Sequence, residues 1–168
     1  MMKIGMKLGI AFSVVTALLI LVIYMGINTA STLNEAVQLL AKDRFPKTVW
    51  ANNIIDALNE NARAFRNAML TNDPKEREKQ IRRAKEVAPI VTSNMDSLRI
   101  NSKTEEERRM VEELKGIRAN YIKGREKLFD LISSDKKQEA ADYLFGEFRQ
   151  YQTDYLDIIT EIITYHTH

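Results

Sequence analysis

Arg118, Tyr121 and Arg125 are the side chains of this 168-residue chain that are best placed to act together on a small molecule. Their spacings of three and four residues put them on one face of a helix. Two guanidinium groups beside a phenol can receive a carboxylate, because each guanidinium presents forked donors and the phenol adds one hydrogen bond. Gly124 leaves space where a larger side chain would otherwise sit. The pattern predicts a carboxylate-binding face.

Three further side chains are predicted to contribute to ligand binding. Arg63 and Arg66 could supply the same chemistry from an earlier helix, and Thr92 comes from the helix between. An ordinary surface role explains Thr92, taken alone, better than a ligand contact does. For the arginines, the alternative is pairing with nearby acids on a solvated surface, where such pairs contribute little. The acids within reach in the sequence are Glu60, Glu112, Glu113 and Glu126.

The motifs of enzymes and cofactor proteins are missing from the sequence. There is no cysteine, and the only histidines are His166 and His168 at the end of the chain. Inward-facing Glu-x-x-His pairs for a di-iron site, a haem attachment motif and an internal histidine for a catalytic triad are therefore all lacking. The 25 basic and 23 acidic residues give no general reason to bind nucleic acid. We expect no catalysis, cofactor or metal, and we interpret both histidines as part of a frayed polar terminus.

The stretch Leu8–Ile27 is long and apolar enough to cross a membrane as a helix. It contains no charged residue, and twenty residues at about 1.5 Å each span a hydrocarbon layer of roughly 30 Å. A cleaved signal peptide is the alternative. Its apolar region is usually shorter, and Asn28 stands where a small residue is wanted before the cut. We therefore predict an uncleaved anchor, with residues 1–28 forming the cytoplasmic N-terminus and span.

Lysine placement predicts the orientation of the anchor. Lys3 and Lys7 precede the span, and no basic residue follows it until Lys42. Because positive charge favours the cytoplasmic side, the N-terminus is expected in the cytoplasm. Residues 29–168 are then expected outside the inner membrane, in a bacterial periplasm.

Apolar residues with alternating steps of three and four predict the rest of the fold. They recur in four stretches: Ile55–Met69, Ile81–Leu98, Met110–Leu131 and Ala141–Tyr165. Short connections between four such helices favour an all-α, antiparallel up-down four-helix bundle. The membrane helix is expected to be continuous with the first helix of this bundle.

Local signals predict where the helices begin and bend. Asp73 before a proline reads as a helix N-cap, and Thr104 with Glu107 reads as a capping box. Pro89 is expected to kink the second helix without ending it. Asp135 is expected to cap the last helix.

Several segments in this order resemble a bacterial methyl-accepting chemotaxis protein. They are the lysine-bearing N-terminus with one span, Asp43-Arg44-Phe45-Pro46, Ala51–Asn67, the turn Asn72-Asp73-Pro74, and Tyr143–Tyr155. The resemblance is to the N-terminal span and the four-helix-bundle ligand-binding domain, and it covers nearly the whole chain.

The resemblance implies a homodimeric periplasmic sensor that binds an amino acid or organic acid and signals by a small displacement of its last helix. In that family, arginines of the first helix and polar groups of neighbouring helices hold the ligand carboxylates; Arg63 and Arg66 occupy the comparable stretch here. The family continues through a second span into a cytoplasmic output region, which we expect to lie beyond His168. The same module in a histidine kinase or a cyclic-dinucleotide enzyme, or a membrane-anchored structural bundle without ligand, are the alternatives.

Overall fold

The computed structural model describes residues 3–167, apart from the side chains of residues 6, 7 and 11. The predictions that concern His168 and the side chain of Lys7 therefore lie outside the described residues. Within the described part every regular element is a helix, as predicted. Contacts between residues divide the chain into two compact units, Met1–Asp43 and Arg44–His168. The predicted limit of the membrane segment at residue 28 concerns where the chain leaves a bilayer, and it stays a prediction.

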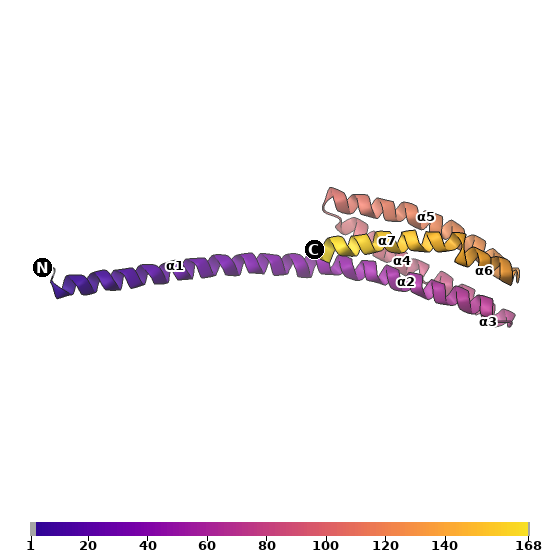
Figure 1. Cartoon of the computed structure of the whole chain (residues 1–168), viewed down its shortest axis with the longest axis horizontal. Helices are drawn as coiled ribbons and strands as arrows, with labels where there is room; N and C mark the ends of the chain where they lie inside the picture. The colour runs from indigo at the N-terminus through magenta and orange to yellow at the C-terminus, as the bar shows by residue number, and fades with distance from the viewer. Residues whose placement is uncertain (1–2, 168) are drawn as a thin grey trace. The chain divides into compact units, whose positions relative to one another are not determined.

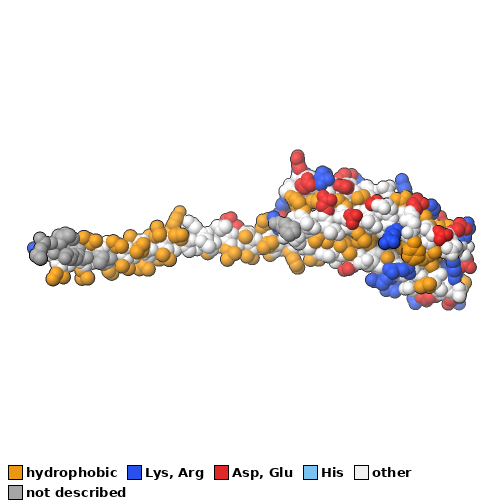
Figure 2. All heavy atoms as spheres, viewed as in Figure 1, with side chains coloured by type: hydrophobic (Ala, Val, Ile, Leu, Met, Phe, Trp, Pro, Cys, Tyr) orange, Lys and Arg blue, Asp and Glu red, His pale blue; other side chains and the backbone are white. Residues whose placement is uncertain are grey.

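The first unit is formed by α1 (Ile4–Leu39) and most of a short π-helical turn, η1 (Leu40–Arg44). Most of the described apolar side chains of α1 are at least half exposed, and Figure 2 shows hydrophobic side chains along it. Among the described residues, one helical stretch is long and apolar enough to cross a membrane, with a mean hydropathy of 2.6 over its best window, and it lies near the N-terminus. A lipid environment would cover this apolar surface.

The second unit is a bundle whose helices lie side by side (Figure 1). It contains α2 (Phe45–Leu70), α3 (Pro74–Glu86), α4 (Ala88–Asn101), α5 (Glu105–Ser133), α6 (Lys137–Phe145) and α7 (Glu147–Thr167). Helix α2 packs against α3, α4 and α7, and α5 packs against α6 and α7. Only Val87 separates α3 from α4 and only Gly146 separates α6 from α7, so the unit consists of four successive helical segments.

Contacts at the two ends of the bundle show which connections lie together. At one end Lys137 Nζ donates to the Thr71 carbonyl at 3.0 Å, which joins the α2–α3 connection to the start of α6. At the other end Thr104 and Tyr165 hydroxyls lie 3.2 Å apart, which joins the start of α5 to the end of α7. The start of α2 lies at this second end, where Lys47 contacts the first turn of α5.

Aromatic rings fill the middle of the bundle core. Phe148 of α7 packs against Phe65 of α2 and Tyr121 of α5, with ring centroids 5.8 and 5.2 Å apart. All three side chains are almost completely buried. The predicted third stretch is confirmed, because most of its residues between Met110 and Leu128 are buried.

In the first stretch, Ile55–Met69, two of the predicted core positions are wrong by one residue. Ile54 and Asn61 are buried in α2, whereas the predicted Ile55 and Ala62 are only partly buried. The polar Asn61 hides the true periodicity, because a sequence pattern counts it as a surface residue.

The predicted helix starts are confirmed at two places. The Asp73 carboxylate accepts a hydrogen bond from the Lys75 backbone N–H at 2.9 Å. Thr104 and Glu107 form a reciprocal capping box at the start of α5. These caps satisfy backbone donors that a helix leaves unpaired in its first turn.

Two local predictions are wrong. Pro89 ends a helix instead of only kinking it, because proline has no N–H and its ring clashes with the carbonyl four residues earlier; α3 stops at Glu86 and α4 starts at Ala88. Asp135 does not cap α6. It has a φ of 57°, in the left-handed region, and its carboxylate pairs with Arg77 at 2.5 Å, so Lys136 takes the cap position.

Candidate functional site

A small cleft lies between helices of the bundle and is bordered by the predicted carboxylate-binding face. Its volume is about 40 Å³. One water needs roughly 10–15 Å³ of such space, so the cleft has room for about three waters or one small polar group. Its lining comes from α2, α4, α5 and α7: Leu58, Asn61, Ala88, Val91, Arg118, Tyr121, Ile122, Arg125 and Tyr155. The structure thus brings Arg118, Tyr121 and Arg125 to one cavity.

Tyr121 forms the buried wall of the cleft. Its side chain is 2% exposed, and its hydroxyl accepts a hydrogen bond from Asn61 Nδ2 at 3.3 Å. Burial raises the pKa of Tyr121 to about 12, against the opposing effects of the Asn61 hydrogen bond and the Arg125 charge. Burial likewise raises the pKa of Tyr155. Both phenols are therefore neutral near pH 7 and can donate as well as accept hydrogen bonds.

Two residues that line the cleft each have a buried polar atom without a hydrogen-bond partner among the described residues. These atoms are the acceptor Asn61 Oδ1 and the donor Arg125 Nε. A buried polar group left unpaired costs about 1–3 kcal/mol, so such atoms are uncommon unless something else pairs with them. Both residues line the cleft, so a polar guest that reached one donor and one acceptor there could satisfy them.

Arg118 reaches across from α5 to α4 at the edge of the cleft. One terminal nitrogen donates to Thr92 Oγ1 at 2.7 Å, and the other lies 3.5 Å from the Met95 sulfur. The Thr92 hydroxyl in turn donates to the Ala88 carbonyl at 3.0 Å. Thr92 itself does not line the cleft. Its contact with the site runs through Arg118, whose side chain it holds in place.

Arg63 and Arg66 are not brought to this cleft. Both are exposed on α2; Arg63 pairs with Glu60, and Arg66 Nε donates to the Ala62 carbonyl at 3.0 Å. The Arg63 hydrogen bond lowers the pKa of Glu60, a group that also contacts Arg83. Within this chain, Arg63 therefore forms an exposed ion pair, which is the alternative to ligand binding that the sequence left open. Arg125 also pairs with a predicted acid, Glu126, at 2.9 Å, but its own side chain is only 12% exposed.

The space expected beside Gly124 is already filled. A Cβ on Gly124 would come within 2.7 Å of Tyr151 Cδ2 and 2.9 Å of Phe148 Cδ2. These rings come from α7, so the glycine allows α5 and α7 to approach closely instead of leaving room for a ligand.

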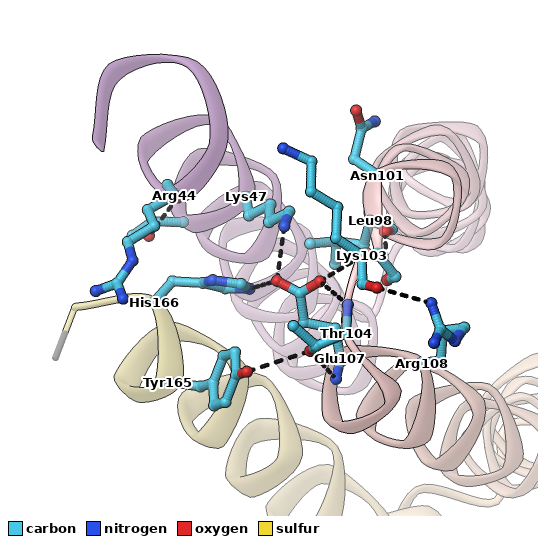
Figure 3. A network of polar contacts seen from close by, with 12 residues as sticks. Arg44, Lys47, Leu98, Asn101, Lys103, Thr104, Glu107, Arg108, Tyr165 and His166 are labelled. Atoms are coloured by element: carbon cyan, nitrogen blue, oxygen red, sulfur yellow. Dashed lines mark hydrogen bonds and ion pairs between the residues drawn. The ribbon is translucent and has the colours of Figure 1, made fainter. Parts of the chain in front are cut away.

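A second polar cluster, formed by Lys47, Glu107 and His166, was missed by the sequence analysis (Figure 3). Their side chains are between 1% and 5% exposed and come from α2, α5 and α7. The interpretation of His166 as part of a frayed terminus is wrong, because it is packed into the end of the bundle. Its two partners, Lys47 and Glu107, are far away in the sequence. The only local sign of ordered polar contacts in this region was the capping box of Thr104 and Glu107.

The Glu107 carboxylate is the centre of this cluster. Burial on its own raises the pKa of Glu107, but hydrogen bonds from Lys47 and from the Thr104 and Lys103 backbone outweigh it and hold the pKa below 4.5. Lys47 Nζ lies 2.6 Å from Oε1, and the Lys103 and Thr104 N–H groups donate to Oε2 at 2.5 and 3.1 Å. Glu107 is thus a fixed anion that joins three helices.

Comparison with protein families identifies the chain. The sequence model of the family described as a four helix bundle sensory module for signal transduction matches residues 1–168. The chain therefore belongs to this family of chemoreceptor sensory modules. No match is found among curated proteins or solved structures.

Proposed function

We propose that this chain is the ligand-binding sensory region of a transmembrane chemoreceptor, and that a small carboxylate binds beside Arg118 and Arg125. The observation that carries the proposal is the cleft with its unpaired donor on Arg125 and unpaired acceptor on Asn61. Guanidinium groups bind carboxylate oxygens through charge-assisted hydrogen bonds. Asn61 Oδ1 needs a donor instead, so a ligand that also carries an amino or hydroxyl group would satisfy both sides.

The size of the cleft limits how the ligand sits. About 40 Å³ accepts one polar group and not a whole amino acid. Binding must therefore move a side chain at the edge, and Arg118 is the natural one because its hydrogen bond to Thr92 is made near the surface. Arg118 would release Thr92 and turn toward the carboxylate, which would change the contact between α4 and α5.

The membrane arrangement belongs to the same proposal. Helix α1 is the anchor with a cytoplasmic N-terminus, and residues 29–168 form a periplasmic up-down bundle that acts as a homodimer. The contacts of the α4–α5 connection with the end of α7, and of the α2–α3 connection with α6, support the up-down order. Ligand binding favours one of two packings, and displacement of α7 carries the signal onward. The alternative receptor is a histidine kinase or a cyclic-dinucleotide enzyme that carries the same sensory module. We propose no catalytic role.

A thermal-shift screen of the whole chain in lipid nanodiscs tests the proposal. Amino acids, hydroxy acids, and di- and tricarboxylates are added one at a time. A true ligand at about 100 times its Kd should stabilise the protein by about 2.7 kcal/mol, or roughly 5–10 °C in Tm.

Matched variants locate the binding site. Arg118→Ala and Arg125→Ala should lose the shift, whereas Arg149→Ala, which removes an exposed arginine on α7, should keep it. Loss of the shift in Arg63→Ala alone would move the site to the surface of α2. The absence of any stabilising carboxylate would favour the structural bundle without ligand.

A further inference from the structure

A second cavity lies between α3 and the end of α5, and it shares no residue with the cleft that Arg118 and Arg125 border. Its volume is about 340 Å³, compared with about 40 Å³ for the cleft. Binding sites for small molecules have volumes of roughly 300–1,000 Å³, so this cavity can hold a whole ligand. Five residues of α3 and one residue of α5 line it: Pro74, Arg77, Glu78, Ile81, Lys85 and Ser133.

Two opposite charges on this cavity have no ionic partner. Glu78 and Lys85 both line it and are exposed, and neither forms an ion pair with another residue of the described part of the chain. Lys85 Nζ lies over the ring of Phe129, 5.1 Å from its centroid. This contact brings no opposite charge to the ammonium, which can still pair with an anion. The cavity thus has an anionic and a cationic end.

The third charged side chain of the cavity, Arg77, already has a partner. It is 9% exposed, and one of its terminal nitrogens lies 2.5 Å from the Asp135 carboxylate. With Arg77 neutralised, the charges of Glu78 and Lys85 are equal and opposite. A dicarboxylate would bring a negative charge close to Glu78, whereas a ligand with one ammonium and one carboxylate complements both ends.

The separation of the two charges determines the length of the ligand. Glu78 and Lys85 are seven residues apart on α3, so they lie on one face of the helix and about 10 Å apart along its axis. A single α-amino acid carries both of its charges on one carbon atom and cannot reach both ends. An extended peptide spans about 3.3–3.6 Å per residue, so three residues cover the distance. Between the ends, Ile81 offers an apolar contact, and Ser133 offers a hydroxyl that can bond to a peptide amide.

We propose that this cavity is a second ligand site, and that it binds a short peptide of about three residues with its ammonium at Glu78 and its carboxylate at Lys85. The sensory module would then accept a class of ligand that the cleft is too small to take. The occupant would contact both α3 and the end of α5. The proposal does not depend on whether the cleft binds a carboxylate.

Calorimetric titration of the whole chain in lipid nanodiscs with trialanine tests the proposal. We expect saturable binding of trialanine. Its N-acetylated and its C-amidated forms should each bind about fivefold more weakly, because each lacks one terminal charge and a partly solvated ion pair contributes about this much. Alanine itself should show no saturable binding over the same concentrations. Absence of trialanine binding, or equal affinity for the blocked forms, would overturn the proposal.

Matched variants of α3 locate the peptide. Glu78→Gln and Lys85→Gln should each weaken trialanine binding about fivefold. Lys75→Gln and Glu86→Gln remove exposed charges of the same helix that do not line the cavity, and they should keep the original affinity. Unchanged affinity in both Glu78→Gln and Lys85→Gln would contradict the proposed contacts.

Exchange of the two charges distinguishes direct contact from an indirect effect. Glu78→Lys and Lys85→Glu should each abolish binding, and the double variant should restore it, with the peptide bound in the opposite direction. A double variant that has the circular dichroism spectrum of the unaltered chain and still fails to bind would count against the proposal. Arg118→Ala, which alters the cleft, should keep trialanine binding. Loss of trialanine binding in Arg118→Ala would place the peptide in the cleft instead, whereas loss of carboxylate binding there concerns only the first site.

Discussion

Lys47 and Glu107 show how a buried ion pair can define one arrangement of two helices, α2 and α5. Both side chains are almost fully buried, and removal of two charges from water is costly unless the remaining hydrogen bonds are made. Here the carboxylate accepts a hydrogen bond from Lys47 and two from the backbone that starts α5. The main effect of the pair is therefore to fix the position of α2 relative to α5, and its net contribution to the free energy of unfolding is smaller.

Removal of Lys47 should expose this dependence. Lys47→Ala leaves a buried anion without its cation, and we expect a loss of about 3–5 kcal/mol in the free energy of unfolding at neutral pH. Lys115→Ala, which breaks the exposed pair with Glu112, should cost less than about 1 kcal/mol. Denaturant unfolding followed by circular dichroism measures both.

The pH dependence of the same variant gives a second check. The pKa of Glu107 is lowered from 4.5 in the folded protein, so the stability that its charge provides is complete above pH 4.5 and is lost as the pH falls through the lowered value. The difference between Lys47→Ala and the unaltered chain should therefore shrink in acid. A difference that stays constant down to low pH would contradict the charge-based account.

At the scale of elements, the close approach of α5 and α7 is set by Gly124. The rings of Phe148 and Tyr151 occupy the place where a Cβ would lie. Gly116, in the same helix, has nothing within 4 Å of that place. Comparison of substitutions at the two glycines therefore isolates the cost of crowding between α5 and α7, because both positions lie in the same helix.

Alanine at these positions should have opposite effects on stability. Both variants gain helix propensity, worth up to about 1 kcal/mol. Gly124→Ala also forces the rings of α7 aside, so it should be less stable than Gly116→Ala by about 1–3 kcal/mol. Thermal unfolding of both variants measures the difference. Equal stabilities would show that the rings of α7 can move aside without loss of stability.

The sequence predicted the helices well and their inward faces less well. Capping signals at Asp73 and Thr104 are local, so they could be recognised from neighbouring residues. The inward position of Asn61 could not, because it depends on the Tyr121 hydroxyl sixty residues away. His166 was misread for the same reason. Of the proposed site, the pattern on α5 could be predicted, while the unpaired atoms of Asn61 and Arg125 appear only once the helices are packed.

At the scale of the whole molecule, we propose that α1 holds the bundle at a membrane with its N-terminus in the cytoplasm. The absence of cysteine allows single-cysteine labelling to test this. Ser134→Cys places a thiol on the exposed connection between α5 and α6, and Ile4→Cys places one before the span. In intact bacterial cells with a permeable outer membrane, an impermeant maleimide should label the first and spare the second. The opposite pattern would reverse the proposed orientation.

The central claim is that a carboxylate ligand enters the cleft between Arg118, Arg125 and Asn61. Calorimetric titration of the whole chain in nanodiscs, with a carboxylate that passes the thermal-shift screen, tests it most directly. We predict saturable binding to the unaltered protein and to Arg149→Ala, and a loss of at least about tenfold in affinity for Arg125→Ala, since a hydrogen bond to a charged group contributes about 1.5–3 kcal/mol. Unchanged affinity in both Arg118→Ala and Arg125→Ala would contradict the account.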